Sequence, residues 1–238
     1  MRFLIVPALL ALALLASGCE DEPVVTQDIV STIPWPDHER AEYVLLNRDG
    51  ERERGRGVLE ASREGNTYEL NIRFEGNGNT DESTVTVDAE TLKPLTVRRE
   101  LTGEDDASFE AEYDAVEGVV RIVETTDGDE REIPRRIDKE HYYDNESSLY
   151  LWRTIDFREG FEAAYHTVLA NQGGVQRVVR LHVVGKEGVT VPAGTFEAWR
   201  VEVRSGDRRQ IVWYADTPER PLVQYDNSRD LLQLTAIE

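Results

Sequence analysis

The residues best suited to catalysis or metal binding are few and widely spaced. The four histidines are His38, His141, His166 and His182. No pair has the His-x-His or His-Glu-x-x-His spacing that brings two imidazoles to one metal ion, so we predict no metal site. The segment His141-Tyr142-Tyr143-Asp144 gathers an imidazole, two phenols and a carboxylate. It could line the mouth of a pocket, although a packed loop is the simpler interpretation.

Other catalytic motifs are missing from the sequence. There is no Gly-x-Ser-x-Gly elbow for acyl transfer, and the glycines of Gly185-Lys186-Glu187-Gly188 lack the spacing of a phosphate-binding loop. Carboxylate pairs are too common in this acidic chain to indicate glycosidase chemistry. We therefore expect a protein that is not an enzyme and uses no cofactor. Convergence of His141, Asp144 and His166 in one cleft would argue the opposite.

The single cysteine, Cys19, closes a typical export signal. Arg2 supplies a basic start, Phe3 to Leu15 form an apolar stretch, and Ala16-Ser17-Gly18 leads to the cysteine. This order predicts a signal peptide over residues 1–18. The small-small-Cys ending resembles the bacterial lipobox, which implies a lipidated N-terminus at Cys19. We therefore expect an exported protein, anchored by lipid to a bacterial membrane and facing the periplasm or the cell exterior, with no thiol left for a disulfide.

The net charge of the chain restricts its partners. The formal charge is −20, which argues against nucleic acid, because phosphates require a basic surface. It also argues against electrostatic adhesion to anionic lipids, so the lipid on Cys19 is the expected contact with the membrane. No second apolar stretch approaches twenty residues, and we expect no transmembrane helix.

Alternation with a period of two dominates the chain after the export signal. Residues 19–36, with three prolines, are expected to form the lipidated cysteine and a flexible tether, and residues 37–238 a single β domain. In the segment 68–74, apolar and polar residues alternate, as in a strand with one buried face. Leu95, Val97 and Leu101 share one parity and are expected on one face. Glycine- and asparagine-rich turns separate the strands.

These elements predict a mainly β fold. We expect about a dozen strands in a single antiparallel meander, which forms a strongly curved sheet or a partial barrel. Residues 144–148 offer helix-capping side chains before Leu149 to Trp152, so one short helix is expected near residues 145–153, against the concave side. In Val191-Pro192-Ala193-Gly194, a hairpin turn with positive φ at Gly194 is predicted. A change of apolar parity between Phe196 and Trp199 predicts a β-bulge there.

Several segments of the C-terminal half resemble one family of bacterial exported β-proteins, domain-of-unknown-function family three-one-zero-eight. The segments that carry the resemblance, most clearly over residues 140–228, are Asp144 to Phe157, Val184 to Glu187, Val191 to Phe196, Ile211 to Tyr214 and Pro221 to Tyr225. The resemblance implies export and an antiparallel β architecture, similar to the half-barrel of periplasmic lipoprotein carriers, which hold acyl chains against a concave sheet. It implies no catalytic residue.

Two functions follow as expectations. The first is a non-catalytic envelope lipoprotein that binds an apolar or amphiphilic ligand in the curved sheet. Six aromatic residues, which otherwise belong to the core, would then line the cavity: Trp152, Phe157, Trp199, Trp213, Tyr214 and Tyr225. The alternative is a structural or assembly protein that docks an envelope partner through a strand edge or its acidic face. The sequence indicates no oligomeric state.

Overall fold

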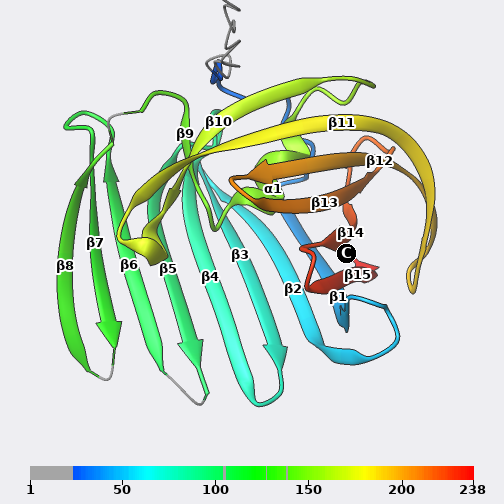
Figure 1. The fold of residues 1–238 in the computed structure, drawn as a ribbon, viewed down its shortest axis with the longest axis horizontal. Helices are drawn as coiled ribbons and strands as arrows, with labels where there is room; N and C mark the ends of the chain where they lie inside the picture. Colours follow the sequence, from blue (N-terminus) through cyan, green and yellow to red (C-terminus); the bar gives the residue numbers. More distant parts are fainter. Residues whose placement is uncertain (1–23, 104–105, 127, 138) are drawn as a thin grey trace, which may run out of the picture.

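A computed structural model describes residues 24–103, 106–126, 128–137 and 139–238 (Figure 1). The predicted signal peptide and Cys19 lie outside the described residues. The described chain is mainly β, with one 15-stranded sheet that is strongly curved and remains open, as predicted. Within the described residues, no helix has the length and apolar character needed to cross a membrane.

The N-terminal half of the sheet consists of eight antiparallel strands joined by hairpins. They are β1 (His38–Asn47), β2 (Glu53–Glu64), β3 (Thr67–Gly76), β4 (Asn79–Asp88), β5 (Pro94–Thr102), β6 (Ala107–Asp114), β7 (Val119–Thr126) and β8 (Asp129–Arg136). Tyr68, Leu70 and Ile72 alternate with polar residues and are buried, as the period of two predicts.

The C-terminal half begins with a short parallel pair and continues as a second meander. Its strands are β9 (Tyr142–Asp144), β10 (Glu162–Leu169), β11 (Val175–Val191), β12 (Gly194–Ser205), β13 (Arg208–Ala215), β14 (Leu222–Asp226) and β15 (Asp230–Ile237). The predicted helix is confirmed as α1 (Ser148–Leu151), followed by the 3-10 turn η1 (Trp152–Thr154); a second such turn is η2 (Ala170–Gln172). β9 runs parallel to β10, which is the exception to antiparallel pairing among the described strands.

The prediction of one simple meander is wrong in its connectivity. The order across the sheet is β8 to β1, then β15 to β9, so two meanders are joined where the first strand pairs with the last, with Ala41 opposite Ile237. The sheet also curls so that its ends approach. The Arg135 side chain donates to the carbonyl of Gly173 at 2.8 Å, and Gln176 donates to the carbonyl of Arg136 at 2.9 Å.

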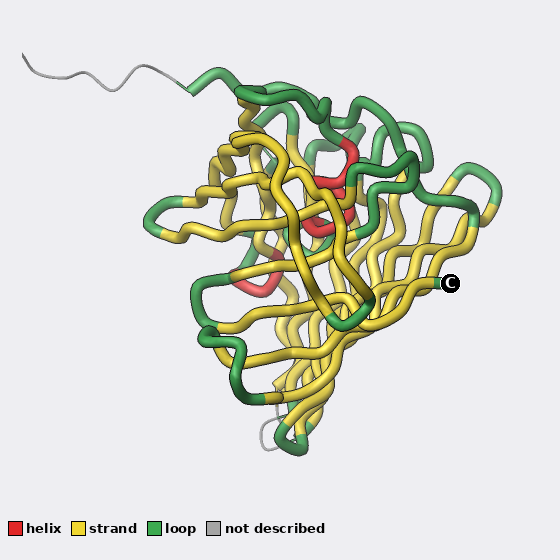
Figure 2. The backbone as a smooth tube through the Cα atoms, turned by 90° about the vertical axis from the view of Figure 1, so that its right-hand side faces the viewer, coloured by secondary structure: helices red, strands yellow, loops and turns green. Residues whose placement is uncertain are grey.

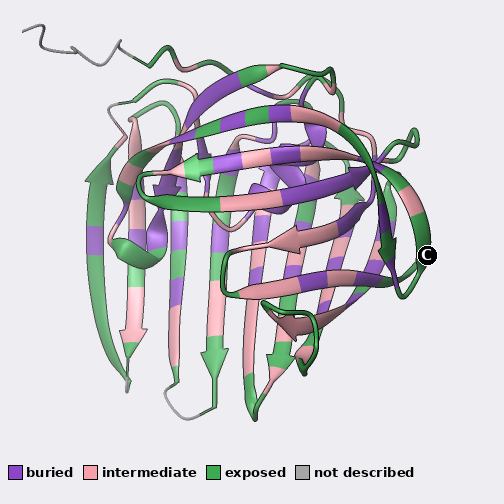
Figure 3. Ribbon diagram, turned by 45° about the vertical axis from the view of Figure 1, so that its right-hand side comes forward, coloured by how far each residue is buried: buried purple, intermediate pink, exposed green. Residues whose placement is uncertain are grey.

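The concave face carries the core, and one end of it is filled by the helical segment. Figures 2 and 3 show the helices inside the bend of the sheet, with buried residues gathered around α1. Leu151 and Ile155 are fully buried there. The expected shared face of Leu95, Val97 and Leu101 is wrong: a register shift opposite Pro94 leaves Leu95 exposed while Val97 is buried, because a bulge reverses side-chain parity.

The expected tether is structured over its second part. The amide of Gln27 donates to the carbonyl of Ala164 at 2.8 Å, and Ser31 and Thr32 both donate to the carbonyl of Thr154. Ile29 and Trp35 are each only 4% exposed. Residues 27–36 therefore form a strap packed on the domain, because their apolar side chains find the core, and the prediction of a flexible tether is wrong for them.

The hairpin at residues 191–194 forms as predicted, with φ +138° at Gly194. The predicted bulge lies elsewhere. The register shift is on β11, between Val183 and Gly185, rather than within residues 196–199 of β12.

Candidate functional site

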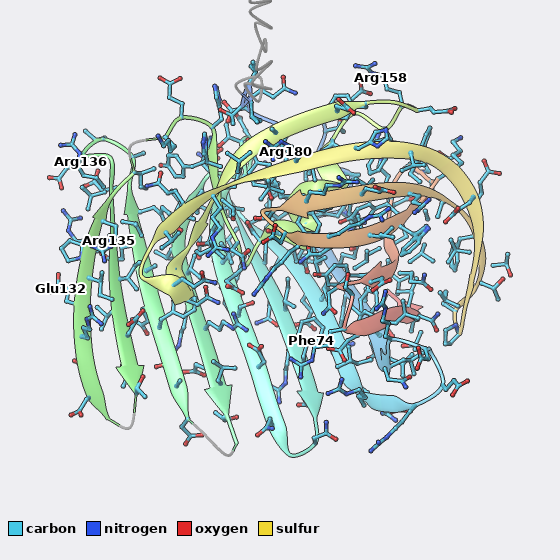
Figure 4. All side chains as sticks on the ribbon, viewed as in Figure 1. Phe74, Glu132, Arg135, Arg136, Arg158 and Arg180 are labelled. Carbon is cyan, nitrogen blue, oxygen red and sulfur yellow. The ribbon has the colours of Figure 1, made fainter. Side chains whose placement is uncertain are left out.

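A cavity of about 420 Å³ lies between the two halves of the sheet, beside α1. Its apolar wall draws on both halves and on the helix. Figure 4 labels Phe74, which projects from β3 in this region. The apolar residues that form most of this wall are Ile72, Phe74, Leu149, Val179, Val203 and Leu232. Cavities of this volume suit small ligands.

Two of the six aromatic residues expected at a cavity lie there. Trp152 and Tyr225 line it, with ring centroids 6.5 Å apart. The Trp152 indole donates to the hydroxyl of Tyr165 at 2.8 Å, and this bond fixes the ring at the cavity wall. These two residues come from η1 and β14, which the fold brings together.

The other four aromatic residues do not line the cavity. Phe157 packs between Trp199 and Tyr214, with centroid distances of 6.0 and 5.8 Å. The Trp199 indole donates to Asp216 at 2.8 Å, and that of Trp213 donates to Glu187 at 2.6 Å. Contacts among these rings and hydrogen bonds of their indoles hold the four residues away from this cavity.

One side of the cavity carries a group of paired charges. Arg99 donates to both oxygens of Asp81 at 2.8 and 2.6 Å, and to both oxygens of Glu146 at 3.2 and 3.3 Å. Farther along the wall, Arg54 pairs with Asp230 at 2.6 Å. Each of the three carboxylates that line the cavity is thus paired with an arginine, and Asp81 and Glu146 share Arg99.

Asp144 lies behind this wall, fully buried. Its side chain accepts hydrogen bonds from the Tyr113 hydroxyl and from the backbone amide of Glu146. Burial, together with the neighbouring charge of Glu146, raises the pKa of Asp144 to about 7. Burial likewise raises the pKa of Glu146. The Asp144 carboxyl group therefore keeps its proton to a higher pH than an exposed aspartate does.

Sequence reasoning missed the polar residues of the cavity wall, and three of them differ from the paired charges above. Thr167, Arg177 and Arg208 line the cavity, and within the described chain neither arginine has a carboxylate partner. Thr167 is 2% exposed, and its hydroxyl has no hydrogen-bond partner. A signal was present: Thr167 lies at the inward parity between Tyr165 and Leu169, and Arg177 shares the inward parity of Val179.

His141, Asp144 and His166, whose convergence would have argued for an enzyme, have different side-chain partners. His141 contacts Asp28 of the strap at 3.1 Å, and His166 bonds the carbonyl of Glu140 at 3.0 Å. Asp144 is held by Tyr113 instead. His38 bonds Ser62, and His182 is exposed on β11. The described residues contain no group of three or more histidine, cysteine, aspartate or glutamate side chains that could hold a metal ion.

Comparison with known proteins places the chain in a family. The model of a protein of unknown function, DUF3108, matches residues 46–227, which extends the resemblance beyond residues 140–228 into the N-terminal half. No curated protein matches the sequence. A crystal structure from Bacteroides fragilis NCTC 9343, described as an exported protein with a YmcC-like fold, is similar at 11% identity, with a TM-score of 0.35, covering 88% of this chain and 99% of the other. The chain belongs to the DUF3108 family.

Proposed function

We propose that this protein is an exported, lipid-anchored envelope protein that binds an amphiphilic molecule in the cavity between its two half-sheets. The anchor is the lipid on Cys19, and the membrane is its partner. No catalytic role is assigned. In the mature chain, residues 19–238, the lipidated Cys19 would stand five residues before Val24, the first described residue.

The observation that carries this proposal is the cavity itself. It joins an apolar wall to a polar side that includes the unpartnered hydroxyl of Thr167. A ligand with an apolar tail and a polar head matches both sides, whereas water alone would leave the apolar wall unsatisfied.

The edges of the sheet do not favour docking of a partner by strand addition. On β8, all residues except Ile133 are exposed; most are charged, and Pro134 interrupts the edge. At the other end, β9 and the strap cover the edge of β10, where Gln27 bonds Ala164. Charged or covered edges are the common protection against such pairing. The cavity is therefore the better-supported site.

The lipid anchor is tested by metabolic labelling in a bacterial host. An alkyne fatty acid should label the wild-type chain and should fail to label Cys19→Ala. Equal labelling of both would contradict the anchor at Cys19.

The ligand is tested by native mass spectrometry and lipid extraction of the mature chain purified from a bacterial envelope. Val179 lines the cavity, and its neighbour Val178 faces the other side of β11. A co-purifying amphiphile should be lost in Val179→Phe, which fills the cavity, and retained in the matched control Val178→Phe. Ser205→Phe, at the less crowded part of the wall, provides a second filled cavity if Val179→Phe melts early.

An empty wild-type protein, or equal occupancy in the filled and control variants, would refute ligand binding at this site.

A further inference from the structure

We infer that the head group of the cavity's ligand is anionic and is bound by Arg177, Arg208 and Thr167. This inference rests on the proposed function and specifies the ligand class: a single-chain amphiphile with a phosphate-like or carboxylate-like head. Four features of the cavity wall support it: two arginines without carboxylate partners, the position of these arginines in the sheet, the unpartnered hydroxyl of Thr167, and the apolar wall beside them.

The charges of the wall are unequally satisfied. Asp81 and Glu146 are bonded by Arg99, and Asp230 by Arg54. Arg177 and Arg208 also line the cavity, both as exposed side chains at its rim, and among the described residues no carboxylate lies within ion-pair distance of either. In a chain of net charge −20, with acidic residues nearly everywhere on its surface, two guanidinium groups left unpaired at one cavity form a local site for an anion.

The register of the sheet places both arginines at one edge. Arg180, Arg204 and Arg209 stand directly opposite one another on β11, β12 and β13. Arg177 precedes Arg180 and Arg208 precedes Arg209, and β11 and β13 run in the same direction because both are antiparallel to β12. The side chains of Arg177 and Arg208 therefore lie on the inward face of the sheet, beyond the row of Arg180, Arg204 and Arg209. Their two strands are about 10 Å apart. Two extended arginine side chains can contact one head group across this distance.

Thr167 supplies the third contact. It stands directly opposite Arg177 on β10, it is 2% exposed, and its hydroxyl has no partner. A buried hydroxyl without a hydrogen bond is unfavourable, so its presence indicates a partner absent from the chain. The Thr167 side chain lines the cavity, and a rotation about its χ1 would turn the hydroxyl, which is buried in the empty protein, toward an anionic oxygen held by Arg177. Gln172, which accepts a hydrogen bond from Arg177 at 3.1 Å, keeps that guanidinium oriented along the wall.

The apolar wall begins beside this polar group. Val179 follows Arg177 at the same parity on β11, and Val203 precedes Ser205 on β12. From there the wall continues to Leu149 and Trp152 beside α1. A head group at the arginines therefore directs its chain along the strands toward the helix, where apolar surface is removed from water.

The test compares three probes by isothermal titration calorimetry of the mature chain: decyl phosphate, decanol and inorganic phosphate. Decyl phosphate should bind about tenfold or more tightly than decanol, the range expected for hydrogen bonds to a charged group. Inorganic phosphate alone should bind far more weakly than decyl phosphate, because it lacks the chain.

Variants assign the preference to the proposed residues. In Arg177→Gln/Arg208→Gln, decyl phosphate and decanol should bind equally. The matched control is Arg136→Gln/Arg180→Gln, two exposed arginines outside the cavity and without carboxylate partners in the described chain (Figure 4). It should keep the preference. Thr167→Val should weaken decyl phosphate several-fold and leave decanol unchanged.

The outcomes separate the two proposals. Equal binding of decyl phosphate and decanol to the wild type, or a preference that survives in Arg177→Gln/Arg208→Gln, overturns the anionic head group but leaves amphiphile binding intact. Binding of neither decyl compound, or binding of inorganic phosphate as tight as that of decyl phosphate, overturns amphiphile binding itself.

Discussion

The two ends of the concave face differ in how far the chain itself satisfies their polar groups. At the end filled by α1, Arg153 donates to both oxygens of Glu39 at 2.6 and 2.8 Å and to the carbonyl of Glu219. The hydroxyls of Tyr43 and Tyr214 reach backbone carbonyls at 3.1 and 2.7 Å. At the cavity end, the Thr167 hydroxyl has no partner and two arginines lack carboxylates.

This difference separates stability from binding. The filled end closes its hydrogen bonds within the chain, so changes there should cost folding free energy. The cavity end keeps polar groups available, so changes there should alter ligand binding more than folding. Trp35 qualifies the comparison: it packs at the filled end against Tyr68 and Tyr150, yet its indole nitrogen is unpartnered.

The largest expected effect is at the filled end. Arg153→Met leaves Glu39 buried without its partner and should lower the free energy of unfolding by about 3 to 5 kcal/mol, measured by urea denaturation. Arg98→Met, which breaks the exposed pair with Glu100, is the control and should change stability little. A loss in Arg153→Met as small as that of the control would remove the distinction between the two ends.

A matched pair of leucines sharpens the comparison. Leu151 lies at the filled end and is 0% exposed, and Leu232 lines the cavity and is 1% exposed. Leu151→Ala should cost about 2 to 5 kcal/mol, because it creates a new void. Leu232→Ala enlarges an existing cavity and should cost about half as much in the empty protein. Equal losses in urea denaturation would show that the cavity wall is packed as tightly as the core.

The pH dependence of stability tests the wall behind the cavity. Because the pKa of Asp144 is raised to about 7 in the folded protein, folding favours the protonated form, and its contribution is lost as pH rises from about 4 through 7. Asp144→Asn cannot ionise, so relative to wild type it should gain stability between pH 5 and pH 8. The same comparison for Asp88→Asn should have the opposite sign below pH 5, since hydrogen bonds from Thr91 lower the pKa of Asp88. A pH profile of Asp144→Asn parallel to wild type would contradict the burial of this charge.

The smallest expected effect is a gain. Thr167→Val replaces an unpartnered buried hydroxyl with a methyl group of the same shape and should raise the free energy of unfolding by about 0.5 to 1.5 kcal/mol. A stabilising change that also weakens ligand binding identifies a residue kept for binding. Destabilisation by this substitution, seen in thermal melts, would mean that the hydroxyl has a partner within the folded chain.

The sequence predicted those features that depend on neighbouring residues. Strands, turns, the helix before Trp152 and the positive φ of Gly194 all follow from local periodicity and turn chemistry. Features set by distant pairing were missed. The contact of Ala41 with Ile237 joins the two meanders, and Ile29 and Trp35 fold back onto the domain; neither is visible in a local pattern.

The candidate site shows the same limit. Aromatic residues alone were a poor guide to the cavity, because ring contacts and indole hydrogen bonds hold four of the six elsewhere. Polar residues at inward-facing positions, such as Thr167 and Arg177, were the better signal for the cavity. The sequence does not show that strands from both halves of the sheet enclose a space beside them, so this signal could be interpreted only with the fold.

The most direct test of amphiphile binding in the cavity is photolabelling of the mature chain with a decyl phosphate that carries a diazirine near the end of its chain, followed by peptide mapping. We predict adducts on the lining residues beside the helix, such as Leu149 and Trp152, suppressed by excess unlabelled decyl phosphate. Adducts confined to the outer face of β1 to β8, or labelling that excess ligand does not suppress, would contradict the account.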